Sequence, residues 1–187
     1  LLVLNQLKER GLEDILIVST DNLSGFSQAI ESVYPKTEIQ KCVIHQIRNS
    51  TKFVSYRDIK ELMKDLKTVY KASTEELALS NLDIFEEKWG KKYPMCVNSW
   101  RNNWAELSTY FKYPEGIRKL IYTTNSIENF NRQLRKVTKN KTIFPSDYAL
   151  QKSLYLAMVD ASSKWTSRIR GWDQILSQLS IFFEGRI

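Results

Sequence analysis

The chain has 187 residues, of which 42% are hydrophobic, enough for a sizeable core in one domain or in one domain with a large insertion. No apolar run approaches the roughly 18 residues that span a bilayer, so we expect a cytoplasmic protein with no membrane partner. The 28 lysine and arginine residues outnumber the 21 acidic residues, and the formal charge of +7 favours a polyanionic partner such as nucleic acid. The two cysteines do not indicate a disulfide framework.

The amino-terminal part of the chain alternates between helical and extended patterns. Leucines recur at helical spacing up to Gly11, which predicts a helix with a glycine cap. The run DILIVST, residues 14–20, predicts a strand that is buried on both faces. Residues 23–33 predict an amphipathic helix, and EIQKCVI, residues 38–44, predicts a second strand. This order is typical of an α/β sheet with parallel neighbouring strands.

The middle of the chain has helical spacing throughout, and we expect no strand between Gln46 and Phe111. The segment STEE, residues 73–76, predicts a capping box at the start of a helix that ends near Gly90. Pro94 is suited to the first turn of the next helix. We therefore expect an all-helical insertion.

Trp100 and Trp104 lie within this helical segment, and their spacing of four residues predicts that they share one face of one helix. A helical core is the usual meaning of such a pair, because tryptophan buries a large apolar surface. The alternative is that one of them stacks on an unpaired base.

Three more helices are expected towards the carboxyl terminus. Thr124 or Asn125 is expected to cap a helix that continues to about Lys139. The other two begin at Ser146 and cover residues 172–183.

Asp21 follows the first predicted strand. A carboxylate at the carboxyl end of a sheet strand lies where α/β proteins bind ligands, so Asp21 is a candidate metal ligand. On this stretch alone a helix cap is the commoner role, because Asp21, Asn22 and Ser24 all stand at the start of the next predicted helix. A phosphate-binding loop is not indicated, because Gly25 stands without further glycines and without a Lys-Ser/Thr pair.

The helix after Thr124 has an apolar stripe and a charged face. At about 100° per residue, one acid and three bases fall within an arc of roughly 60°: Glu128, Arg132, Arg135 and Lys139. Lys136 belongs to the same basic stretch. The ordinary explanation is a solvated face on which Glu128 and Arg132 form an i, i+4 ion pair worth only about 0.3 to 0.5 kcal/mol. The functional alternative is a metal-binding carboxylate followed by cations that contact phosphates.

Three stretches together resemble the mutator-type transposases of bacterial insertion sequences: STDNLSGF, IQKCVIHQIRNS and YTTNSIENFNRQLRKVTK. The resemblance covers nearly the whole chain. In that family a ribonuclease H-like core carries an Asp-Asp-Glu triad, and a helical insertion separates the second Asp from the Glu. Asp21 corresponds to the second Asp and Glu128 to the Glu, 128 − 21 = 107 positions later. The resemblance therefore favours a metal-binding role for both acids, with capping as a second role of Asp21.

The resemblance implies an α/β fold, mostly helical overall, in which a partial ribonuclease H-like core is interrupted by a large all-helical insertion. Residues 1–45 would form the first part of the core, residues 46–115 the insertion, and residues 116–187 the second part. It also implies strand cleavage by water and then strand transfer by a 3′-hydroxyl, with a pair of Mg²⁺ or Mn²⁺ ions held by carboxylates. DNA is the expected partner, and the active complex is expected to be a homo-oligomer.

Cys42 and His45 match the family's Cys-x-x-His signature. The spacing also suits zinc, but zinc sites usually have four ligands, and the chain has one histidine and two cysteines. We therefore expect a buried Cys42 and a His45 that forms hydrogen bonds or faces phosphate near the active site. Asn125 and Trp100 complete the set of supporting residues.

The first Asp of the family's triad is expected on a strand upstream of the matched region, before Leu1. Asp14 is no substitute, because it lies seven residues before Asp21 on the predicted strand, about 23 Å away. We therefore expect an amino-terminally truncated fragment that is inactive by itself. The alternative is a non-catalytic fragment for DNA binding or multimerisation.

Overall fold

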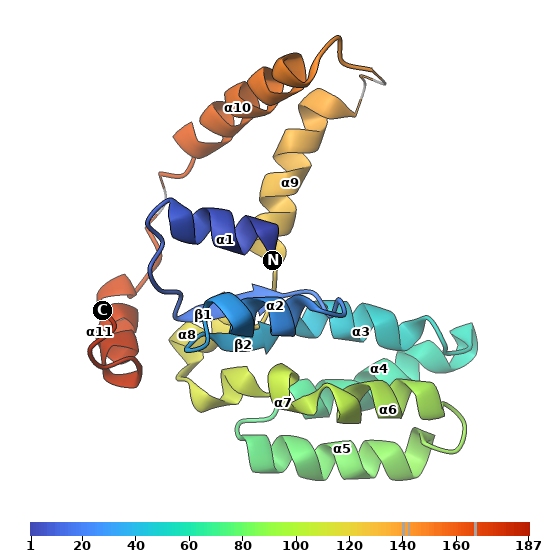
Figure 1. Ribbon diagram of the computed structural model, residues 1–187. Coiled ribbons are helices and arrows are strands. Elements are labelled where there is room, and N and C mark those ends of the chain that lie inside the picture. The colour runs from blue at the N-terminus through green and yellow to red at the C-terminus, as the bar shows by residue number, and fades with distance from the viewer. Residues whose placement is uncertain (140, 142, 167) are drawn as a thin grey trace. The chain divides into compact units, whose positions relative to one another are not determined.

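The computed structural model describes residues 1–187 except Asn140, Thr142 and Ser167, and the chain divides into two compact units (Figure 1). The first unit comprises residues 1–123 and 174–187, and the second comprises residues 124–173. The described residues are mostly helical, with 66% in helices and 4% in strands. None of the described helices is long and apolar enough to cross a membrane.

The first unit begins with helix α1 (Leu2–Glu9), which ends at the predicted glycine. Gly11 has a φ of 94°, its N–H donates to the carbonyl of Lys8, and the next N–H donates to the carbonyl of Leu7. This pair of hydrogen bonds satisfies the last carbonyls of the helix, and glycine adopts the required conformation without a steric penalty. The expected cap is confirmed.

A two-stranded parallel sheet follows among the described residues, formed by β1 (Ile17–Thr20) and β2 (Glu38–Lys41). Ile17 pairs with Glu38 and Thr20 with Lys41. The predicted helix, strand, helix, strand order and the parallel pairing are both confirmed.

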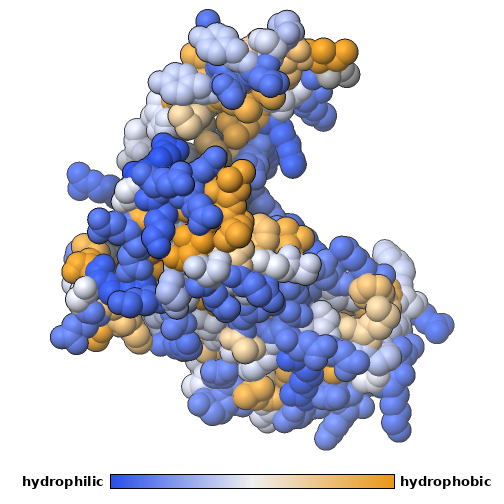
Figure 2. Space-filling model, in the orientation of Figure 1, coloured by the Kyte–Doolittle hydropathy of each residue, from blue (hydrophilic) through white to orange (hydrophobic). Residues whose placement is uncertain are grey.

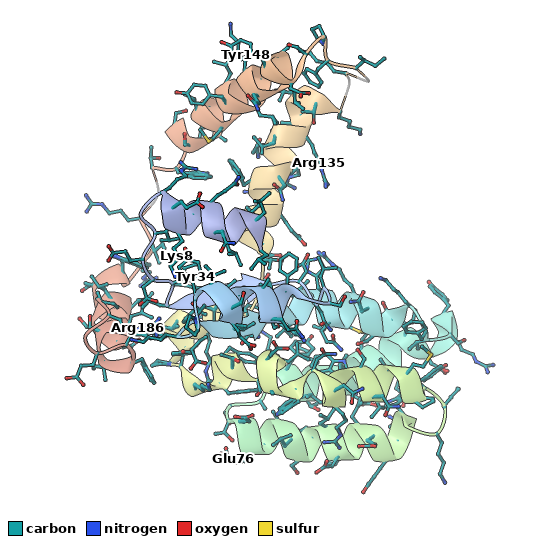
Figure 3. All side chains as sticks on the ribbon, viewed as in Figure 1. Lys8, Tyr34, Glu76, Arg135, Tyr148 and Arg186 are labelled. Atoms are coloured by element: carbon teal, nitrogen blue, oxygen red, sulfur yellow. The ribbon has the colours of Figure 1, made fainter. Side chains whose placement is uncertain are left out.

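β1 begins at Ile17 and not at residue 14, so it is shorter than predicted. Asp14 lies before the strand. Its carboxylate accepts two hydrogen bonds from Arg186, each of 2.8 Å, and one from the N–H of Ile15. Arg186 lies near Tyr34 and Lys8 in Figure 3. These contacts hold the carboxyl terminus against the entrance to β1.

Helix α2 (Phe26–Val33) begins later than predicted. Its N-cap position is occupied by Gly25, whose φ of 82° suits a residue without a side chain. Asp21 stands four residues earlier and does not cap this helix, so the capping role expected for Asp21 is wrong.

From β2 to residue 123 the described chain is helical and contains no strand, as predicted. Pro94 occupies the first turn of its helix, as predicted. The cap of the preceding helix is Thr74, whose hydroxyl accepts from the N–H of Leu77, so this helix begins one residue later than the predicted capping box implies. The helices are α3 (Val43–Thr51), α4 (Tyr56–Tyr70), α5 (Glu75–Trp89), α6 (Pro94–Asn102), α7 (Trp104–Leu107), the 3-10 helix η1 (Thr109–Lys112) and α8 (Glu115–Ile121).

The core of the first unit lies where these helices meet. Helices α4, α5 and α6 run side by side (Figure 1), while α7, η1 and α8 pack against the sheet. Leu62, Leu82 and Phe85 are fully buried between them. Helix α11 (Trp172–Phe182) packs against this unit. The centroid of the Phe182 ring lies 5.1 Å from that of Tyr113.

The second unit is a pair of helices, α9 (Asn125–Thr138) and α10 (Asp147–Ser163). Ser146 caps α10 as predicted, because its hydroxyl accepts from the N–H of Ala149. The rings of Phe130 and Trp165 lie 5.7 Å apart, yet much apolar surface of α10 stays exposed. Apolar patches interrupt the hydrophilic surface in Figure 2.

Candidate metal centre and its polar surroundings

Asp21 stands directly after β1, at the edge of the sheet where both parallel strands end. The N–H of Cys42 donates to the carbonyl of Thr20 at 2.7 Å and so extends the ladder by one step beyond β2. Because the carboxyl ends of parallel strands meet at one edge, Asp21 and Cys42 become neighbours although they are 21 positions apart in the sequence. This is the edge at which the sequence predicted a ligand site.

Cys42 occupies the N-cap position of α3, and His45 lies in the first turn of the same helix. The Nδ1 atom of His45 lies 2.9 Å from Oδ1 of Asp21. One ligand atom each of Asp21, Cys42 and His45 lie within 4.8 Å of one another. The structure thus brings together three of the residues that the sequence singled out.

The partners of His45 indicate its tautomer. Nη1 of Arg48 lies 3.4 Å from Nε2 of His45, and a guanidinium group can only donate hydrogen bonds. On the other side of the ring, the carboxylate of Asp21 only accepts hydrogen bonds, so the Nδ1–H of His45 donates to it. This hydrogen bond orients the Asp21 carboxylate, whose side chain is 44% exposed and accessible to a ligand.

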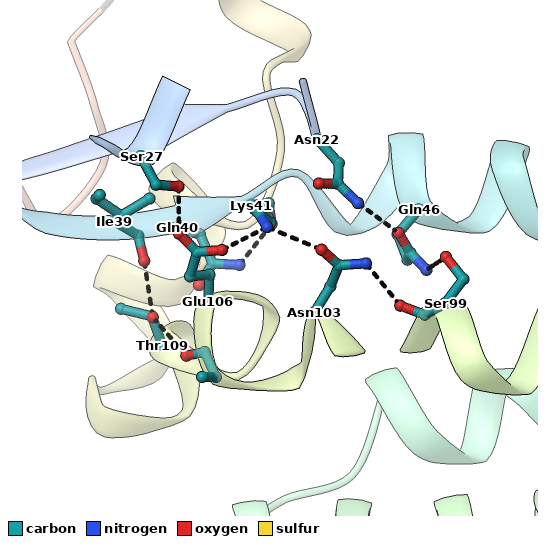
Figure 4. Close-up of polar contacts among 11 residues, drawn as sticks. Asn22, Ser27, Ile39, Gln40, Lys41, Gln46, Ser99, Asn103, Glu106 and Thr109 are labelled. Carbon is teal, nitrogen blue, oxygen red and sulfur yellow. Dashed lines mark hydrogen bonds and ion pairs between the residues drawn. The ribbon is translucent and has the colours of Figure 1, made fainter. Parts of the chain in front are cut away.

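A network of polar side chains holds the loop that follows Asp21 (Figure 4). At one end, Asn22 donates to Oε1 of Gln46 at 3.4 Å, and the fully buried Gln46 donates to Oγ of Ser99 at 2.8 Å. At the other end, the hydroxyl of Ser27 donates to the carboxylate of Glu106. The loop is therefore held at one end by α3, which is bonded to α6, and at the other end by α7.

Lys41 and Asn103 join the two ends of this network (Figure 4). Lys41 forms an ion pair with Glu106, and its Nζ donates to Oδ1 of Asn103 at 2.8 Å. Nδ2 of Asn103 donates to the carbonyl of Ser99 at 2.7 Å, so the polar contacts run without a break from Asn22 to Ser27.

The polar network lowers the pKa of the Glu106 carboxyl group. Burial raises its pKa, but the hydrogen bonds and charge of Lys41 and the hydroxyl of Ser27 outweigh burial, so the pKa lies below its ordinary value. Glu106 is therefore ionised at neutral pH and holds Lys41 at the end of β2.

Sequence reasoning missed this network. A usable signal was present in α3, where Gln46 and Ser50 share the spacing of the apolar residues Val43 and Ile47 and are buried with them. Polar residues on the buried face of a helix need partners, which in this fold come from α6.

Trp100 is part of the core. Its side chain is 1% exposed, and its indole N–H donates to Oγ of Ser50 at 2.7 Å. Trp104 is half-buried and donates to Glu75 at 3.1 Å. The core interpretation of Trp100 is supported, because a ring this deeply buried has no face on which a base can stack.

Glu128 belongs to the second unit, in the first turn of α9. It is half-buried and lines a polar hollow together with Asn125, Asn129 and Arg132. Nη2 of Arg132 donates to Oδ1 of Asn129 at 2.8 Å. The expected supporting residue Asn125 thus shares a pocket with Glu128. The carboxylates of Asp21 and Glu128 belong to two separate units, so the short distance expected between them stays a prediction.

The basic residues of α9 and of its C-cap position are all exposed: Arg132, Arg135, Lys136 and Lys139. Lys136 borders a second hollow, between α9 and α10, together with Lys141, Asp160 and Lys164. These cations are accessible to a polyanion.

Comparison with known proteins gives the family. Residues 1–168 match the family described as "Transposase, Mutator family". The transposase for insertion sequence element ISRM3 of Rhizobium meliloti is 43% identical over 185 residues, which cover 98% of this chain and 46% of that protein. A probable transposase for an insertion sequence element of Corynebacterium diphtheriae is 35% identical, with 96% of this chain and 58% of that protein covered. The transposase for insertion sequence element IS905 of Lactococcus lactis is 32% identical, with coverages of 97% and 46%.

The chain therefore spans about half the length of the curated relatives that it matches. The family match covers most of the chain and includes both the Asp21 segment and helix α9. By sequence and by these matches, the chain belongs to the Mutator family of transposases.

Proposed function

We propose that this chain is the catalytic portion of an insertion-sequence transposase, in which Asp21 and Glu128 bind Mg²⁺ or Mn²⁺ for cleavage and strand transfer of DNA. The observation that carries the proposal is the position of Asp21. Its accessible carboxylate ends a strand of a parallel sheet, and hydrogen bonds orient both this carboxylate and the loop that follows it. Membership of the Mutator family supports the same assignment.

The ligand chemistry fits the proposal. Mg²⁺ prefers carboxylate oxygens and retains several waters, so it requires an accessible acid and not a closed cage. When bound, a pair of such ions activates an attacking oxygen and stabilises the leaving oxygen of an in-line displacement. Asp21 then positions the metal at the sheet edge, while His45 keeps the Asp21 carboxylate oriented through its Nδ1 proton.

The role of Glu128 rests on the family motif and on its surroundings in α9. The exposed cations that follow it suit the phosphates of the bound strand, since phosphate contacts fix the register of DNA without reading its sequence. In the proposed domain arrangement, residues 1–45 and 116–187 form a ribonuclease H-like core and residues 46–115 form the insertion. DNA ends and a second copy of the chain are the proposed partners.

A nicking assay on supercoiled plasmid tests the proposal, with a chain of the relatives' full length in Mg²⁺ or Mn²⁺. Asp21→Asn and Glu128→Gln should each abolish nicking, because each removes a charged metal ligand without changing the shape of the side chain. Glu87→Gln is the matched control, because Glu87 is exposed on α5, and this variant should nick like the wild type. Metal-dependent nicking that survives in the Asp21→Asn variant would contradict the proposal.

A second function is favoured by the exposed basic residues of α9, namely DNA binding without cleavage by this chain alone. The same assay separates the two functions when it is paired with a binding titration. Salt-dependent DNA binding by this chain, with no nicking by the same chain in Mg²⁺ or Mn²⁺, would establish the second function.

A further inference from the structure

Asp21, Cys42 and His45 together offer an oxygen, a sulfur and a nitrogen ligand. We propose that this trio binds a borderline-soft divalent cation of the Zn²⁺ class. The proposal goes beyond the proposed function, which assigns Asp21 to a hard cation held by oxygen ligands. It does not depend on DNA cleavage and is tested by metal binding alone.

The distances suit such an ion. Zn²⁺ binds sulfur at about 2.3 Å and nitrogen or oxygen at about 2.0 to 2.2 Å, so ligand atoms around a tetrahedral ion lie about 3.3 to 3.7 Å apart. The three ligand atoms already lie within 4.8 Å of one another. His45 Nδ1 and Asp21 Oδ1, now 2.9 Å apart, would separate slightly as the ion takes the place of the Nδ1 proton. That proton leaves to solvent, and the neutral ring then carries its proton on Nε2, which breaks the contact with Arg48.

The surroundings permit the remaining adjustment. The side chains of Asp21 and His45 are 44% and 24% exposed, so rotation about their side-chain bonds can close the site. Cys42 is buried and fixed, and the other two ligands approach it from the solvent side. Three protein ligands leave a fourth position open to water.

Helix α3 places two of the ligands together. Cys42 is the N-cap residue of this nine-residue helix. His45 follows in the first turn of that helix, and residues three apart lie on the same face. A thiolate sulfur selects Zn²⁺-class ions over Mg²⁺.

The number of ligands explains why zinc was not expected from the sequence. Cys42 and His45 alone provide too few ligands. The third ligand is the carboxylate of Asp21, which follows the neighbouring strand β1. Nη1 of Arg48 lies 3.4 Å from His45 Nε2, and its positive charge opposes the ion. We therefore expect weaker binding than at a structural zinc site with four protein ligands.

The test is a titration of the purified chain with Cd²⁺, which reports sulfur ligation through the charge-transfer band of a cadmium–thiolate bond. The wild type should bind one equivalent with this band, and added Zn²⁺ should remove the band by displacement. The Cys42→Ser variant should lack the band. Cys96→Ser is the matched control, because Cys96 is equally buried and burial raises the pKa of its thiol, and this variant should keep the band.

The other two ligands provide a check that does not alter the buried cysteine. His45→Ala and Asp21→Asn should each keep the band but weaken Cd²⁺ binding by about tenfold or more, as judged by calorimetric titration. A band that disappears in Cys96→Ser, or unchanged affinity in both His45→Ala and Asp21→Asn, would overturn the proposal. The circular dichroism of each variant verifies its fold, and if Cys42→Ser is unfolded these two variants decide.

Discussion

The surroundings of Asp21 and of Glu128 differ in burial and in the reach of their contacts. Near Asp21, Gln46 and Lys41 are bonded to residues of α6 and the segment after it, more than fifty positions further along the chain. Near Glu128, none of the residues Asn125–Thr138, all of which the structure describes, is buried. The position of Asp21 is therefore set by tertiary packing, whereas α9 relies on local helix formation and on its pairing with α10.

The largest expected difference between the two regions comes from two tryptophans. Trp100→Ala should lower the free energy of unfolding by about 3 to 5 kcal/mol, because it removes a fully buried ring and its hydrogen bond to Ser50. Trp165→Ala should cost about 1 kcal/mol or less, because the side chain of Trp165 is 65% exposed. Denaturant unfolding followed by circular dichroism measures both. Equal losses would remove the contrast between the two regions.

The next largest difference in stability between the two regions is expected from substitution of two glutamates. Glu106→Gln should cost about 2 kcal/mol, because it leaves the largely buried ammonium group of Lys41 without its anionic partner. Glu128→Gln should change the free energy of unfolding by no more than about 0.5 kcal/mol. A Glu106→Gln variant as stable as the wild type would show that the polar network does not hold the loop after Asp21.

The contribution of Glu106 should also depend on pH. Its pKa in the folded chain lies below the ordinary value of 4.5, so folding favours the ionised form. The resulting stability is fully present above pH 4.5 and is lost as the pH falls through the folded pKa. The difference in unfolding free energy between wild type and Glu106→Gln should therefore be larger at about pH 7 than at about pH 3. A difference that grows towards acid would contradict this sign.

The smallest change in stability is expected on the basic face of α9. Arg132→Ala and Arg135→Ala should each alter the free energy of unfolding by about 0.5 kcal/mol or less. Each should nevertheless reduce the salt dependence of DNA binding by about one phosphate contact, equally for unrelated sequences. Lys91→Ala, at an exposed position of the first unit, is the control and should leave the salt dependence unchanged. A loss confined to one DNA sequence would indicate base contacts instead.

Local patterns predicted much of the fold. The β-branched run before Asp21 predicted β1, apolar spacing predicted the helices, and Gly11 predicted the end of α1. The second strand was predicted to reach residue 44 but ends at Lys41, and Val43 and Ile44 belong to α3. The start of α2 was missed because Asp21, Asn22 and Ser24 are all good capping residues. The backbone instead uses the positive φ of Gly25, which places the start of the helix beyond them.

The candidate site was only partly predictable, because its contacts join distant residues. Asp21, Cys42 and His45 were singled out one by one, but only the parallel pairing of β1 with β2 makes them neighbours. Lys41 and Glu106 resemble surface residues in the sequence, since nothing local shows that a charged residue has an ion-pair partner 65 positions away. Tertiary packing determines both features.

The most direct measurement is a crystal structure of a chain of the relatives' full length grown with Mn²⁺, located by its anomalous scattering. We predict Mn²⁺ with oxygen ligands from both Asp21 and Glu128, whose carboxylates should lie within about 4 to 8 Å of each other. Mn²⁺ bound at Asp21 with Glu128 more than about 12 Å away in an ordered core would contradict the proposed catalytic pair.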